Sequence, residues 1–125
     1  MCHGDFHPLN ILVKDGKVTG VLDWAGFLIT DPTLDVAYTI TLTTIHGRQY
    51  ISPPELEKVV ENYLDAYMGK RPLSLDHLAY FRALRCVQSL LQGAQGQEYW
   101  RMPHAEKELI SHIHKITNIR ITTPK

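Results

Sequence analysis

The stretch His3-Gly4-Asp5-Phe6-His7-Pro8-Leu9-Asn10 decides the fold, because two runs of β-forming residues follow it directly. The runs cover residues 10–14 and 18–24, and Asp15-Gly16 lies between them. An Asp-Gly pair flanked by such runs is a strong hairpin signal, since both turn residues need a positive φ. The sequence therefore predicts one small β-hairpin whose ends carry Asp5, Asn10 and Asp23.

The two-residue turn fixes the pairing of this predicted hairpin. Residue 14 then faces 17, 12 faces 19, 10 faces 21 and 8 faces 23, and side chains alternate between the two faces. One face is wholly apolar and requires a core; it carries Leu9, Ile11, Val13, Val18, Gly20, Leu22 and Trp24. On the other face Asn10 and Asp23 are diagonal neighbours, roughly 7–8 Å apart. This placement requires a ladder without a β-bulge, and the alternative is that the two residues simply end the strands.

Four amphipathic segments follow the hairpin and predict helices. The first begins at Thr33 and ends near residue 45, the second follows Ser52-Pro53-Pro54-Glu55 and stops at Gly69, the third runs from Ser74 to about residue 92, and the fourth starts at Pro103. The predicted buried stripe of the third helix is Leu75, Leu78, Phe81, Leu84, Val87 and Leu91, and Cys86 and Leu90 widen it. Residues 118–125 are expected to form a frayed tail. The predicted fold class is α+β, with the hairpin packed on a mainly helical body.

Length and composition favour a single domain of ordinary globular type. The 125 residues contain 13 basic and 13 acidic side chains, so no electrostatic feature favours a nucleic acid or an anionic membrane as partner. Cys2 and Cys86 form no CxxC pair, the start of the chain does not read as a signal peptide, and no apolar run is long enough to span a bilayer. We expect a cytoplasmic protein with residues 1–32 as the hairpin and its flanking loops, and residues 33–117 as a helical subdomain.

The residue types at the ends of the hairpin suit a magnesium ion that carries a phosphate. Asp5 and Asp23 supply carboxylates and Asn10 supplies a neutral oxygen, and Mg²⁺ takes few protein ligands at about 2.1 Å while it keeps waters and phosphate oxygens. A further carboxylate can accept a proton from a hydroxyl group. His-x-Asp with Asn five residues after the Asp matches the catalytic loop of phosphoryl-transfer enzymes.

Several motifs in order then give a resemblance to a known family. The motifs are residues 3–12, Val21-Leu22-Asp23-Trp24, Asp31-Pro32 and Asp35-Val36-Ala37. Together they resemble the aminoglycoside phosphotransferase and choline kinase family, which shares the protein-kinase fold. The resemblance covers roughly the first third of the chain. It implies that residues 1–125 form a partial domain, the C-terminal-lobe portion of a protein-kinase-like fold.

The resemblance also implies a role for each site residue. Asp5 matches the catalytic aspartate, and Asn10 and Asp23 match the residues that hold Mg²⁺ and thereby the nucleotide. His3 and Asp35 match residues that support the loop. Gly4, where protein kinases usually have Arg, favours a small-molecule kinase over a protein kinase.

The implied activity is ATP- and Mg²⁺-dependent transfer of the γ-phosphate to a hydroxyl of an aminoglycoside, choline-like or sugar-like acceptor. The sequence identifies neither the acceptor nor the choice between ATP and GTP. It contains no glycine-rich loop and no lysine-bearing strand, which the family places in an N-terminal lobe. We therefore expect a truncated enzyme with very weak or no activity by itself.

Two other interpretations remain open at this point. The chain could be a non-catalytic remnant or interaction module of the same fold, which self-associates or pairs through apolar surface that its missing neighbour leaves exposed. Alternatively, His3, Asp5 and His7 could form a transition-metal site of a hydrolase.

Overall fold

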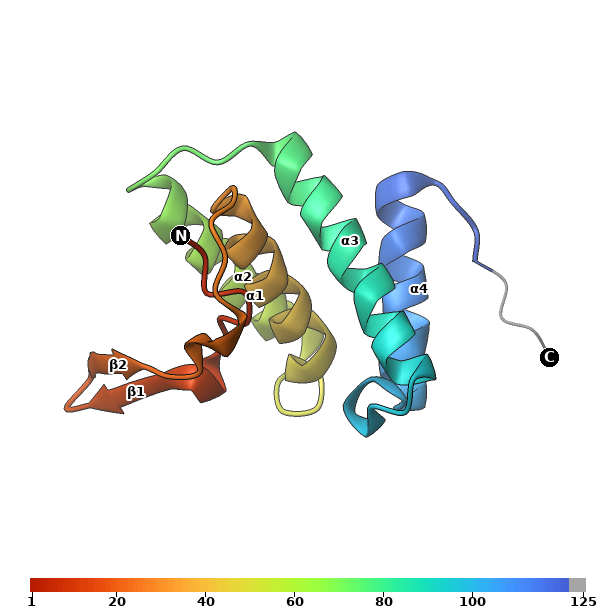
Figure 1. Cartoon of the computed structure of the whole chain (residues 1–125), viewed down its shortest axis with the longest axis horizontal. Helices are drawn as coiled ribbons and strands as arrows, with labels where there is room; N and C mark the ends of the chain where they lie inside the picture. Colours follow the sequence, from red (N-terminus) through yellow and green to blue (C-terminus); the bar gives the residue numbers. More distant parts are fainter. Residues whose placement is uncertain (122–125) are drawn as a thin grey trace.

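The computed structural model describes residues 1–121 of the chain. The elements in chain order are the 3-10 turn η1 (Pro8–Asn10), strands β1 (Ile11–Lys14) and β2 (Lys17–Val21), the 3-10 turn η2 (Trp24–Gly26), helices α1 (Thr33–Gly47), α2 (Pro53–Met68) and α3 (Leu75–Ala94), the 3-10 turn η3 (Glu98–Trp100), and helix α4 (Pro103–Thr117). Four helices and one antiparallel hairpin confirm the predicted mixed class. Figure 1 shows the hairpin on the side of α1 and α2, extending away from α3 and α4. Within residues 1–121 no helix combines the length and the apolar character needed to cross a membrane.

The helices begin where the capping residues predict. The Ser52 backbone N–H donates to the Glu55 carboxylate at 3.1 Å, which is one half of the capping box of α2. The Ser74 Oγ accepts from the backbone N–H of His77 at 3.3 Å and caps α3. The end of α4 is marked by Asn118, which has a left-handed φ of 59°. The predicted tail begins there, and its residues 122–125 lie outside the described residues.

Helix α1 is the centre of the helical body. It packs against α2, α3 and α4, and both apolar clusters of the core include its side chains. Val36, Ala37 and Ile40 join Leu78 in one cluster, which α2 covers. Further along α1, Leu42 and Ile45 meet side chains of α3, η3 and α4 in the other. Burial of each such side chain contributes about 1.5–3 kcal/mol, so the core fixes α1 firmly.

The predicted buried stripe of α3 is partly wrong. Leu75, Val87 and Leu91 are exposed, at 68%, 41% and 57% of their surface. Leu78 and Cys86 of the predicted face are buried, and Arg85, Ser89 and Gly93 are buried beside them. At Gly93 the backbone of η3 explains the difference, because a Cβ there would lie 3.1 Å from the Trp100 carbonyl oxygen. Hydrophobic periodicity does not detect a position where small size is required.

The predicted register of the hairpin is wrong beyond the turn. Lys14 pairs with Lys17 as expected, but Leu12 pairs with Gly20 and Ile11 with Val21, because the ladder shifts between Leu12 and Val13. The shift is a β-bulge that adds one residue to β2. The alternation argument that placed Asn10 and Asp23 on one face therefore fails.

The hairpin is also less packed than predicted. Only its base faces the helices, where Ile11 lines a small apolar cavity together with side chains of α1 and α2. The apolar side chains further along the strands stay exposed, including Val13 and Val18 at 63% and 66%. Within the described part of the chain, the apolar face has no core of its own.

Candidate functional site

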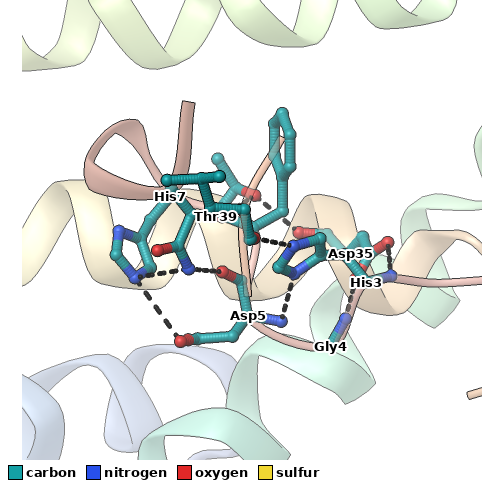
Figure 2. Close-up of polar contacts among 9 residues, drawn as sticks. His3, Gly4, Asp5, His7, Asp35 and Thr39 are labelled. Carbon is teal, nitrogen blue, oxygen red and sulfur yellow. Dashed lines mark hydrogen bonds and ion pairs between the residues drawn. The ribbon is translucent and has the colours of Figure 1, made fainter. Parts of the chain in front are cut away.

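The loop that precedes the hairpin is fixed to α1 by backbone hydrogen bonds. The Asp35 carboxylate accepts from the backbone N–H groups of His3 at 2.6 Å and Gly4 at 2.8 Å. The Thr39 hydroxyl donates to the Phe6 carbonyl at 2.7 Å, one turn further along the helix. Figure 2 shows these contacts around the loop. Two side chains of α1 thus satisfy polar backbone groups that have no partner in a sheet or helix.

The buried His3 side chain connects this loop to the end of β2. Its Nε2 lies 2.7 Å from the Leu22 carbonyl oxygen, and its Nδ1 accepts from the backbone N–H of Asp5 at 3.3 Å. Because Nε2 faces a carbonyl oxygen and Nδ1 faces an N–H group, we assign the ring proton to Nε2. The imidazole also packs on the Trp24 ring, with 4.6 Å between centroids.

These contacts overturn the transition-metal interpretation. Both ring nitrogens of His3 have backbone partners, so neither has a free lone pair for a metal. In residues 1–121, no group of three His, Cys, Asp or Glu side chains is placed to hold a metal ion. His3, Asp5 and His7 therefore do not form a hydrolase metal site.

A close backbone approach joins the loop to the segment after Asp23. Gly4 has a φ of +82°, and a Cβ there would lie 2.3 Å from the Gly26 carbonyl oxygen. Next to it, the Cys2 N–H donates to the Leu28 carbonyl at 2.7 Å and the Leu28 N–H donates back at 3.1 Å. Only glycine fits at residue 4, for its φ and for this contact. The sequence pattern marked Gly4 only as a difference from protein kinases. It marked Cys2 only as a cysteine outside any CxxC pair.

Asp5, His7 and Asn10 form one polar cluster. The Asn10 Nδ2 donates to the Asp5 carbonyl at 3.0 Å and lies 3.2 Å from the His7 Nε2. The same His7 nitrogen lies 3.4 Å from the Asp5 carboxylate, which is 44% exposed. Because the amide nitrogen of Asn10 is turned toward the loop, its Oδ1 remains available to a ligand. The sequence gave His7 a role only in the transition-metal alternative; here its Nε2 faces both residues and, according to its tautomer, either accepts from the Asn10 amide or donates to the Asp5 carboxylate. Figure 2 shows His7 beside Asp5.

Asp23 lies at the open end of the hairpin in an unusual backbone conformation. Its φ of 58° and ψ of 65° are left-handed, which costs a non-glycine residue about 1–2 kcal/mol. Its side chain is exposed and does not cap η2. The Leu22 N–H donates to the Asn10 carbonyl at 2.8 Å, so Asp23 directly follows the residue that pairs with Asn10. Backbone pairing, and not a shared strand face, brings the two residues to the same end.

The buried Arg85 of α3 packs against aromatic side chains of α1 and η3. Its guanidinium lies over the rings of Tyr38 and Trp100, at 4.8 and 5.3 Å. Burial lowers the pKa of Arg85, and the charges of Tyr38 and Asp5 oppose that shift. Burial raises the pKa of Tyr99, and the charges of Tyr50 and Asp5 add to that shift.

The sequence of this chain is similar to one family of known proteins. A family model described as the APH phosphotransferase enzyme family matches residues 1–80, which include every predicted site residue. The chain belongs to this family. It is 36% identical over 64 residues to the "Uncharacterized protein YcbJ" of Bacillus subtilis (strain 168), covering 50% of this chain and 18% of that protein. It is 29% identical over 86 residues to the aminoglycoside 3'-phosphotransferase of Streptomyces fradiae, covering 67% of this chain and 30% of that enzyme.

The matching segment thus spans less than a third of either relative. No solved structure matches the chain significantly.

Proposed function

We propose that the chain carries the catalytic segment of an ATP- and Mg²⁺-dependent small-molecule phosphotransferase, from the C-terminal lobe of a kinase-like fold. The observation that supports this most is the cluster of Asp5, His7 and Asn10, which lies on a loop that Asp35 fixes to α1. This cluster lies inside the segment that matches the family. The acceptor is a hydroxyl-bearing small molecule of the aminoglycoside, choline or sugar type.

In this proposal Asp5 is the catalytic residue. Its carboxylate is partly exposed, so a bound hydroxyl group can reach it. It orients that hydroxyl and accepts its proton as the phosphoryl group arrives. The His7 Nε2 lies 3.4 Å away and restrains the carboxylate when that nitrogen carries the proton.

Asn10 and Asp23 are the proposed holders of Mg²⁺ and, through it, of the nucleotide phosphates. The free Oδ1 of Asn10 and the exposed carboxylate of Asp23 are the hard oxygen donors that this ion prefers. When bound, the ion neutralises charge on the phosphate oxygens during transfer. His3 and Asp35 contribute by holding the loop and have no contact with the reacting groups.

An assay of phosphate transfer tests the proposal. The protein is incubated with labelled ATP, Mg²⁺ and a panel of aminoglycoside, choline-like and sugar acceptors, and Asp5→Asn is compared with Asp15→Asn. Asp15 is a matched control because it is an exposed aspartate in the hairpin turn. Loss of a positioned base lowers kcat by about 10²–10⁴-fold, so Asp5→Asn should fall by that factor while Asp15→Asn is unchanged. Measurable transfer that is equal in wild type and Asp5→Asn would contradict the assignment.

The second candidate is a non-catalytic interaction module, and the exposed apolar hairpin favours it. Leu9, Val13, Val18 and Trp24 are all exposed, which is unusual for neighbouring residues of one hairpin. A module of this kind would self-associate, and Val18→Lys would reduce that association. Concentration-dependent light scattering, together with no transfer to any acceptor by the wild-type chain, would favour the module over the enzyme.

A further inference from the structure

A second cavity lies away from the Asp5 loop, between the end of α1 and helices α2, α3 and α4. Its volume is about 270 Å³, far more than a single water needs. Asp5, Asn10 and Asp23 do not line it. Its charged or titratable lining residues are Arg48, Glu57, Glu61, Arg82, His112 and Lys115.

Arg82 has no protein partner in this cavity. Its Nε is buried without a hydrogen bond, and no carboxylate of residues 1–121 lies within 4.0 Å of Arg82 or Lys115. Burial lowers the pKa of Arg82, and the nearby Cys86 is the group that opposes this shift. Buried polar groups in proteins are normally hydrogen-bonded, so the unsatisfied Nε–H donor of Arg82 on the wall of an open cavity suits an acceptor from outside the chain.

The nearby carboxylate on α4 is already occupied. Glu108 pairs with Arg48 at 2.8 Å, and its backbone carbonyl accepts from the His112 Nδ1 at 2.8 Å. That bond leaves the His112 Nε2 without an assigned partner. Burial lowers the pKa of His112, and Arg82 and Lys115 lower it further, while Glu108 opposes them. Arg82 and Lys115 therefore line the cavity without an acidic partner among residues 1–121.

The acidic residues of the cavity, Glu57 and Glu61, lie on α2. Both are exposed, and so is Lys115, whereas Arg82 is half-buried. Water screens all three exposed charges, so Arg82 carries the least screened charge of the four.

We propose that this cavity binds a small phosphate-bearing anion through Arg82 and Lys115, with His112 as a third contact. A guanidinium and an ammonium group together match the charge and the several acceptor oxygens of a phosphate dianion. The phosphate can be free or part of a small monoester, since the two present the same group. This site is separate from the proposed phosphotransferase site and does not depend on that function.

An NMR titration of the chain tests the proposal. Inorganic phosphate and glycerol phosphate are added in separate arms at constant ionic strength, with chloride as the reference salt. The shifts of the Arg82 Nε–H and of the His112 ring are followed. We expect the shifts to saturate. The phosphate that binds more tightly shows whether the site takes free phosphate or a monoester.

Four variants determine whether the shifts report this site. Arg82→Gln should weaken binding by about tenfold or more, because it removes a charge-assisted hydrogen bond. Lys115→Gln should weaken it several-fold, Glu61→Gln should tighten it, and the exposed Arg71→Gln should leave it unchanged. Lys115 and Glu61 are exposed, so these variants keep the test valid if Arg82→Gln does not fold. The absence of saturation in both arms, or equal binding by wild type, Lys115→Gln and Glu61→Gln, would overturn the proposal.

Discussion

The segment before α1 and the four-helix body are held in place by different forces. In the body, Ile40, Ile45 and Leu109 have at most 1% of their surface exposed, so apolar burial dominates. Before α1, Cys2 and His3 are the buried residues, and the hairpin shows most of its apolar surface to solvent. That segment is positioned mainly by directional hydrogen bonds to Asp35 and Thr39 of α1, and His3 bonds to Leu22 within the segment.

This difference separates global stability from the geometry of the candidate site. A change in the core should lower the stability of the whole molecule, and not that of the loop alone. A change in the anchors should loosen the loop while the helices stay folded. The predictions below test this separation, from the largest expected effect to the smallest.

The largest effect is expected in the core around α4. Leu109→Ala removes a fully buried side chain and should lower the free energy of unfolding by about 3–4 kcal/mol. Val13→Ala, on the exposed face of β1, should change it by less than about 0.5 kcal/mol. Urea unfolding followed by circular dichroism measures both. Comparable losses in the two variants would contradict the division between a buried body and an exposed hairpin.

The next effect concerns the anchor of the loop. Asp35→Asn replaces a carboxylate that accepts two backbone hydrogen bonds, at a cost of about 2–3 kcal/mol. Amide hydrogen exchange should accelerate at His3 and Gly4 more than at the core residues of α3. Asp65→Asn, on the exposed side of α2, is the control and should leave all these rates unchanged. Uniform acceleration along the chain would show that the anchor acts on global stability instead.

Comparison of Gly4 with Gly16 tests the contact between the loop before the hairpin and the segment after Asp23. Gly4 and Gly16 both have positive φ, at 82° and 72°, but only Gly4 faces a neighbouring carbonyl. Gly4→Ala should therefore destabilise the protein by about 2 kcal/mol more than Gly16→Ala. Thermal unfolding of the two variants gives the difference, and equal losses would mean that φ alone explains both.

The smallest effect is a dependence on pH in the helical body. Burial, aided by His104 and Arg85, lowers the pKa of His46 from 6.5 to about 4. The unfolded chain binds a proton near pH 6.5 while the folded chain does not, so stability falls as the pH drops from about 6.5 to 4. The loss from His46 between pH 7 and pH 5 should be about 1–2 kcal/mol.

The variant His46→Phe keeps a ring against Tyr99 and removes both unpaired nitrogens. Its stability should decline less than that of wild type over the same pH range, as measured by urea unfolding at each pH. Part of the decline should remain, because the pKa of His112 is also lowered. Parallel pH profiles for the two proteins would exclude His46 as the source.

Local chemistry explains which features were predictable from the sequence. Asp15-Gly16 specified the turn, and Ser52, Glu55 and Ser74 specified two helix starts, since each acts on its own neighbours. The site residues were identifiable because they occur as an ordered motif within about thirty residues.

Other features depend on contacts between distant segments, which no local pattern reports. The bulge adds one residue to β2 beside Gly20, and a glycine inside a strand is compatible with a bulge but does not specify one. Gly93 is buried against η3, and the Thr39 hydroxyl reaches the Phe6 carbonyl across 33 positions. The cavity around Arg82 combines side chains of four helices.

A Mg²⁺ titration of the wild-type chain, Asp23→Asn and Asp15→Asn tests the central claim most directly. Both aspartates are exposed and left-handed, with φ of 58° and 50°, and asparagine tolerates that conformation, so the variants differ only in location. The proposed roles of Asn10 and Asp23 predict saturable amide shifts at both residues in wild type and in Asp15→Asn, and their loss in Asp23→Asn. Equal Mg²⁺ binding by all three proteins would contradict a phosphotransferase metal site at this end of the hairpin.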